Sequence, residues 1–130
     1  MPVDYTLEER GGCLRVTVVG NTDSPDELIG CIDAVLADCA RIGCGNILFD
    51  HRGLRFGREF VGNYDTALRL SRRLSTERPM RVALVSRPER MEFARIYEPI
   101  GVGRGAEIKA FDGAPMAVVW LTGGPKTPLD

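Results

Sequence analysis

The 130-residue sequence lacks any apolar run that approaches the roughly 20 residues needed to cross a bilayer. Its N-terminus, MPVDYTLEER, contains no basic region followed by a hydrophobic one, so a secretory signal peptide is not expected. We therefore predict a cytoplasmic protein without stable membrane insertion. The length and the 44% content of hydrophobic residues suit one domain with its own core.

Cysteine pairs with the spacing of metal or redox sites are also missing. The chain has four cysteines but no CxxC pair, and without an export signal we expect reduced thiols. Cys31 and Cys39 fall on a predicted helix, where eight residues place them about 12 Å apart, too far to share a zinc ion. The cysteines are therefore interpreted as small buried hydrophobic residues. We predict no metal site and no cofactor.

Sequence signatures of nucleotide binding and nucleophilic catalysis are absent. No GxSxG pattern occurs, and no Walker lysine follows the glycines of GVGRG at 101–105. That stretch precedes a predicted strand instead of following one, so it is interpreted as a turn after a helix. The pI near 5.9 and the lack of interleaved basic and aromatic residues argue against nucleic acid as a partner.

The net charge of −1 conceals a strong asymmetry along the chain. Residues 1–51 contain nine acidic residues and three arginines, whereas residues 52–104 contain twelve arginines and six acidic residues. Such a basic segment can form a docking face for an anionic partner. The alternative is a solvated surface on which the charges happen to segregate.

The apolar pattern predicts alternating strands and helices. Residues 3–9 and 14–18 alternate across a Gly-Gly turn, which is typical of a β-hairpin. A capped amphipathic helix follows, with Ser24 as N-cap, Pro25 at the first helical position, Glu27 completing a capping box, and an end near Gly43. The further elements expected are strands at 46–51, 81–85 and 107–111, and helices at 57–75, from Pro88 onward, and after Asp112 as cap.

The predicted order is ββαβαβαβα, which indicates an α/β fold with a mixed sheet of four to five strands and helices packed against it. We expect a single domain over 1–121 and a mobile tail over 122–130.

Three stretches carry a resemblance to a known family: LRVTVVGNTD at 14–23, NILFDHRGLRF at 46–56 and AFDGAPMAVVWL at 110–121. With the capped helix between the first two, their order resembles the STAS domains of anti-sigma-factor antagonists, and more closely small bacterial STAS/SEC14-type proteins. The resemblance implies a SpoIIAA-like fold and a regulatory role. In the family a phosphorylatable serine or threonine follows the strand that ends in the aspartate matched by Asp50. GREF at 57–60 has no hydroxyl, so we expect no phosphoswitch.

The best candidate for a functional site is the segment 50–60, where strand 46–51 is expected to give way to a loop and a helix N-terminus. Ligands of open α/β sheets bind at such places, and backbone N–H groups there favour anions. The predicted binding residues are Asp50, His51, Arg52, Arg55, Phe56, Gly57 and Arg58.

The single histidine is not predicted to be catalytic. Adjacent residues of a strand point to opposite faces, so Asp50 and His51 cannot form a dyad. Cys44 would lie roughly 20 Å from His51 along a straight strand. We expect no thiol or hydroxyl within reach of the imidazole.

These observations predict a non-enzymatic, cytoplasmic regulatory or adaptor module. Its partner would be a protein or a small anionic or lipid-like ligand, and an uncovered sheet edge would permit a homodimer. The alternative left open is a small hydrolase or isomerase that uses His51 and an acid from another element.

Overall fold

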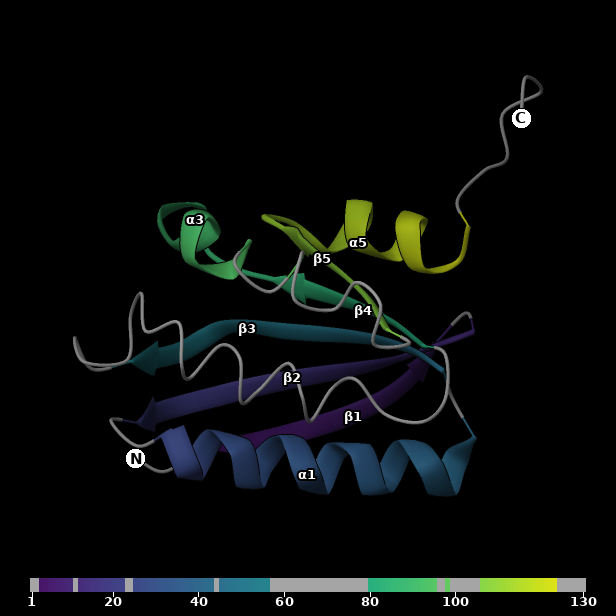
Figure 1. Ribbon diagram of the computed structural model, residues 1–130, viewed down its shortest axis with the longest axis horizontal. Coiled ribbons are helices and arrows are strands. Elements are labelled where there is room, and N and C mark those ends of the chain that lie inside the picture. The colour runs from purple at the N-terminus through teal and green to yellow at the C-terminus, as the bar shows by residue number, and fades with distance from the viewer. Residues whose placement is uncertain are drawn as a thin grey trace.

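The computed structural model describes residues 3–10, 12–22, 25–43, 45–56, 80–95, 98 and 106–123. A five-stranded sheet with the order β1-β2-β3-β4-β5 lies at the centre of this structure (Figure 1). β1 is antiparallel to β2, and each later strand is parallel to its neighbour, which confirms the predicted α/β fold with an antiparallel edge. The strands span Asp4–Arg10 (β1), Cys13–Thr22 (β2), Asn46–Phe56 (β3), Met80–Val85 (β4) and Ala106–Phe111 (β5).

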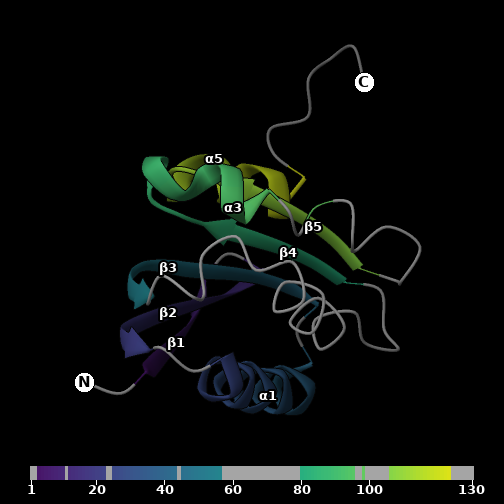
Figure 2. The same cartoon turned by 60° about the vertical axis from the view of Figure 1, so that its left-hand side comes forward.

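Helices cover both faces of the sheet. The described helices are α1 (Pro25–Ile42), the 3₁₀ turn η1 (Pro88–Arg90), α3 (Met91–Ala94) and α5 (Ala114–Leu121). Figures 1 and 2 show α1 on one side of the sheet and α3 and α5 on the other. Among the helices described, none is both long and apolar enough to cross a membrane.

Two hydrophobic clusters correspond to these two layers. The larger cluster joins α1 to the sheet and contains Val35, Ile47 and Phe49, and the smaller one joins α5 to the sheet and contains Leu48 and Ala117. Because Ile47, Leu48 and Phe49 alternate between the clusters, β3 is buried on both faces, as its continuous apolar run predicts.

The hairpin and the first helix form as their sequences predict. Gly12, at a φ of +85°, makes the turn between β1 and β2. Gly43, at a φ of +82°, ends α1, and its N–H donates to the carbonyl of Cys39 at 2.8 Å. The predicted cap, Ser24, lies outside the described residues.

β3 is longer than predicted, and this is a correction. The sequence predicts that the strand ends at His51 and that a loop begins at Arg52, but β3 continues to Phe56. Its pairing with β2 explains the difference, because β2 extends ten residues and its last four, Val19 to Thr22, pair with Gly53 to Phe56. Between Thr17 and Val19 the register shifts, and one extra residue of β3 forms a bulge.

The start of α5 also differs from the prediction. Asp112 is expected to cap this helix, but the N-cap position is Gly113, and it makes no side-chain capping bond. Pro115 lies in the first turn, where a missing N–H costs nothing.

Some predictions fall on other parts of the chain. The helix at 57–75, the GVGRG turn at 101–105 and most of the predicted tail lie outside the described residues. The division into a domain at 1–121 and a tail stays a prediction. Cys13 and Cys39 are buried as predicted, Cys31 is partly buried, and no described group of His, Cys, Asp or Glu could hold a metal ion.

Candidate functional site

The end of β3 projects beyond its neighbour β4. β3 has 11 residues and β4 has six, and their pairing stops where Asp50 lies opposite Val85. Residues 51–56, which we call the β3 extension, still pair with β2 on one edge. On the other edge the structure shows no strand pairing for them within the described residues. The backbone groups of that edge need other partners.

Two arginines supply such partners. The Nε of Arg87 donates to the carbonyl of Arg52 at 2.7 Å, and Nη1 of Arg90 donates to the carbonyl of Leu54 at 2.8 Å. Both arginines come from the segment that follows β4, so guanidinium groups bind carbonyls that a longer β4 would bind through backbone N–H groups. These two arginines thereby hold the edge of the β3 extension that β4 does not reach.

Asp50 is a buried carboxylate clamped by two guanidinium groups. It accepts hydrogen bonds from Arg52 Nε at 2.9 Å and Arg52 Nη2 at 2.7 Å, and from Arg15 Nη2 at 3.2 Å. Burial raises the pKa of Asp50, but the hydrogen bonds and the charge of Arg52, together with Arg15, outweigh burial and hold that pKa below its ordinary value. Asp50 is therefore an ionised anchor for two arginines.

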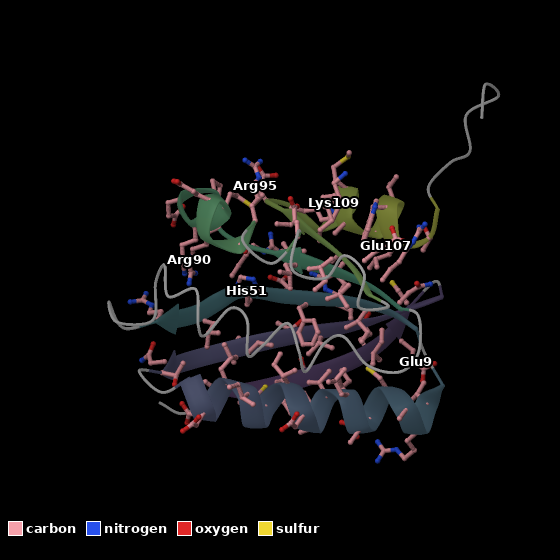
Figure 3. The ribbon with its side chains drawn as sticks, viewed as in Figure 1. Glu9, His51, Arg90, Arg95, Glu107 and Lys109 are labelled. Carbon is pink, nitrogen blue, oxygen red and sulfur yellow. The ribbon has the colours of Figure 1, made fainter. Side chains whose placement is uncertain are left out.

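His51 faces the opposite side of the sheet. Its Nε2 forms a hydrogen bond of 3.0 Å with Oγ of Ser86, which is fully buried. Figure 3 shows His51 and Arg90 at the same end of the sheet. Burial, followed by the positive charge of Arg90, lowers the pKa of His51 to about 4, against the weaker opposing effect of Asp50. The imidazole is therefore neutral at physiological pH.

The contact with Ser86 corrects one prediction and leaves another intact. We expect no hydroxyl near His51, and this is wrong, because Ser86 follows Val85 and thus reaches the position beside His51 in the parallel register. The expectation that Asp50 and His51 point to opposite faces is confirmed, since Asp50 pairs with Arg15 and Arg52 while His51 pairs with Ser86.

This serine–histidine pair does not have the features of a nucleophile and its base. Ser86 has no exposed surface through which a substrate could reach its oxygen. The neighbouring carboxylate, Asp50, is engaged by guanidinium groups on the other face and does not orient the ring. A buried hydroxyl that satisfies a buried imidazole is the interpretation that the geometry favours.

The described surface around the β3 extension is strongly cationic. Arg52 and Arg55 lie on it, Arg87 binds the carbonyl of Arg52, and Arg15 reaches Asp50, the residue before it, from β2. Two guanidinium groups thus share the carboxylate of Asp50. Arg55 is exposed, at the outer part of the extension. Such a surface attracts anionic groups.

The seven predicted site residues are only partly described. Asp50, His51, Arg52 and Arg55 lie on β3 as above, Phe56 is its last residue, and Gly57 and Arg58 lie outside the described residues. Sequence reasoning missed Arg15, Ser86, Arg87 and Arg90, which come from β2 and the segment after β4. Only the strand register brings them to β3, and no local pattern signals it.

A scan against models of protein families finds no match, and a search of curated proteins finds none either. The fold of this chain does match those of solved structures, and these matches show that it is STAS-like, of the SpoIIAA-like type.

One match is an uncharacterized protein of the DUF3478 family with a SpoIIAA-like fold from Shewanella loihica PV-4. It has a TM-score of 0.58 and 17% identity, over 92% of this chain and 94% of that one. Another is an anti-sigma factor antagonist from Mycobacterium paratuberculosis, with a TM-score of 0.55 and 17% identity, over 92% and 93% of the two chains. At this level of identity the two matches show the fold, and the non-enzymatic role stays a prediction.

Proposed function

We propose that this protein is a cytoplasmic, non-enzymatic regulatory module that binds a protein partner at the β3 extension. The observation that carries the proposal is the cationic surface itself: Arg15 and Arg52 bind Asp50, Arg87 binds the carbonyl of Arg52, and the exposed Arg55 follows on the same strand. Two of them, Arg15 and Arg52, are fixed by Asp50, and Arg87 is fixed by a backbone carbonyl. Arginines held in this way lose less entropy when they bind an anionic group than freely moving ones do.

The comparisons support the regulatory part of this proposal. One structural neighbour is described as an anti-sigma factor antagonist, a regulatory protein. Regulation in this chain would not use a phosphorylated hydroxyl after β3, because residues 57–60 are GREF. A small anionic or lipid-like ligand is the second kind of partner that the arginines would accept.

Homodimerisation through a sheet edge is a separate part of the proposal. β5 is an edge strand of the described sheet, but its edge is partly occupied, because the N–H of Ala110 donates to Oε2 of Glu98 at 2.8 Å. A side-chain carboxylate that binds an edge N–H hinders pairing with another strand. The binding surface at the β3 extension does not depend on a second copy.

The proposal is tested by quantitative affinity capture from the source cells with the tagged full chain. We expect Arg55→Glu to reduce recovery of a stoichiometric protein partner at least about tenfold, which corresponds to about 1.4 kcal/mol of binding free energy. Arg95→Glu is the matched control, because Arg95 is an exposed arginine that lies after α3 instead of on β3. Equal recovery by the wild type and Arg55→Glu, or equal loss in both variants, would contradict the proposal.

A further inference from the structure

Part of one sheet face is not covered by α5. This helix packs on Cys13, Leu48, Ala83 and Val85, which lie toward the other end of the strands. Beyond it, paired residues on the same face form a row across three strands, since Asp4 of β1 lies opposite Val19 of β2, and Val19 lies opposite Gly53 of β3. All three residues are exposed.

The centre of this row is apolar and shallow. Val19 is an exposed hydrophobic residue, with 36% of its surface accessible, and Gly53 beside it has no side chain. A Cβ atom at Gly53 would lie 2.9 Å from Cγ1 of Val19, which is closer than real contacts allow. The glycine therefore lets Val19 lie against the strand, in space that a side chain at position 53 would otherwise need.

Charges of opposite sign border this apolar centre on its two sides. Arg52 and Arg55 flank Gly53 on β3, and Arg87 binds the carbonyl of Arg52. On the far side of Val19 stands Asp4, and the other exposed acidic residue of β1 on this face is Glu8, which pairs with Arg15 across the strands. An anionic ligand would thus be attracted to the β3 side and repelled from β1.

We propose that an acidic segment of the protein partner docks on this surface, which consists of Val19, Gly53, Arg52, Arg55 and Arg87. This inference rests on the proposed function and names the chemistry of the partner. An apolar side chain of the segment lies on Val19 and Gly53, and its carboxylates pair with Arg55 and Arg87. The carboxylates of β1 determine how the segment is oriented, because they repel its acidic residues from the β1 side of the surface.

The arrangement of the guanidinium groups favours a peptide over a single phosphate. Arg52 and Arg15 are already bound to Asp50, and Arg87 is bound to the backbone. The two donors that do converge, Arg15 and Arg52, thus already meet at a carboxylate of the protein itself, and Arg55 and Arg87 are not part of that pair. Cations that are spread along a strand and stand beside an apolar spot match carboxylates that are spread along a peptide.

The test is a titration of the ¹⁵N-labelled full chain with defined probes, followed by amide NMR. The first probe is a five-residue peptide in which leucine is flanked by two glutamates on each side, and the second replaces the glutamates by glutamines. Inorganic phosphate is the third probe. We expect the acidic peptide to shift the amides of Val19, Gly53 and Arg55, and the glutamine peptide to leave them unchanged.

Variants sharpen this result. Arg55→Glu should weaken binding of the acidic peptide at least tenfold, and Arg95→Glu should leave it within twofold. Val19→Thr, a substitution of similar size, should weaken it about threefold by making the apolar centre polar. Each variant is compared at the same ionic strength, because contacts between exposed charges weaken as salt is added.

Three results would overturn the inference. They are equal binding of the glutamine peptide, stronger binding of phosphate with the same amide shifts, and shifts that centre on α3. If the peptide fails while Arg55→Glu still loses the captured partner, this inference is wrong and the proposed function stands. If capture is unaffected by Arg55→Glu, the proposed function itself fails.

Discussion

Two neighbouring residues of β3 place a polar side chain on each face of the sheet, and one side chain is charged while the other is neutral. On the α5 side, Asp50 keeps its charge because two guanidinium groups bind it. On the α1 side, His51 is held neutral, with its Nε2 bonded to Ser86. The cause is the environment, because Asp50 is bound by two arginines, whereas the His51 ring is desolvated beside Ser86 and lies near the positive charge of Arg90.

The comparison shows where recognition can occur. The neutral imidazole of His51 forms a hydrogen bond with Ser86 and offers no charge to a partner. The Asp50 side, in contrast, holds several cations at the surface. The adjacent acid and histidine look like a catalytic pair in the sequence, but they belong to two separate networks. The β3 extension thus has a structural side and a side suited to binding.

The largest effect on stability is expected from removing the negative charge on the α5 side. Asp50→Asn leaves Arg15 and Arg52 without their anion, and we expect a loss of about 2 kcal/mol in the free energy of unfolding, between the values for buried and surface pairs. Urea denaturation measures it. The matched control is Asp38→Asn, which loses the ion pair with Arg41, a side chain that is 73% exposed, but keeps an oxygen to accept from the Tyr5 hydroxyl. Its loss should stay under about 1 kcal/mol. Equal losses would show that Asp50 is not a special anchor.

A second prediction addresses the α1 side through acid titration. The pKa of His51 is lowered to about 4 in the folded state from an ordinary value of 6.5, so the unfolded chain takes up a proton that the folded chain does not. The contribution of the neutral imidazole to stability is therefore complete above pH 6.5, and it falls toward pH 4 as the unfolded chain takes up the proton.

The Asp50 side predicts no such loss in that range, because a lowered carboxylate pKa acts only below its ordinary value of 3.8. Denaturation curves between pH 7 and pH 4 for the wild type and His51→Gln separate the two sides. The variant should lack the loss seen between pH 6.5 and pH 4. An unchanged pH dependence in His51→Gln would refute a buried neutral imidazole.

The smallest effect on stability is expected at Gly53, the exposed residue that follows the bulge in β3. Gly53→Ala places a methyl group 2.9 Å from Cγ1 of Val19, and this partly exposed side chain must rotate or shift. We expect a destabilisation of about 0.5–1 kcal/mol, the cost of a strained rotamer. Thermal unfolding of Gly53→Ala and of Gly53→Ala/Val19→Ala measures it, and the double variant should recover most of the strain. A stabilised single variant would show that Val19 does not limit the space.

Much of the fold could be predicted from local patterns. The alternation in β1 and β2, the apolar stripe of α1 and the continuous apolar run of β3 each specify an element and its buried side. Gly12 and Gly43 mark turns because they adopt positive φ angles. The opposite directions of Asp50 and His51 follow from the period of a strand, so the sequence also excluded a dyad between them.

By itself, the sequence determined the α/β class, the antiparallel edge and the position of a candidate site at the end of β3. Only the tertiary structure decided how far β3 extends and which side chains reach it. The length of β3 depends on its pairing with β2, and the positions of Arg15, Ser86 and Arg87 depend on the register between strands. These contacts join residues 35 positions apart in the chain, and local propensity carries no information about such distant pairs.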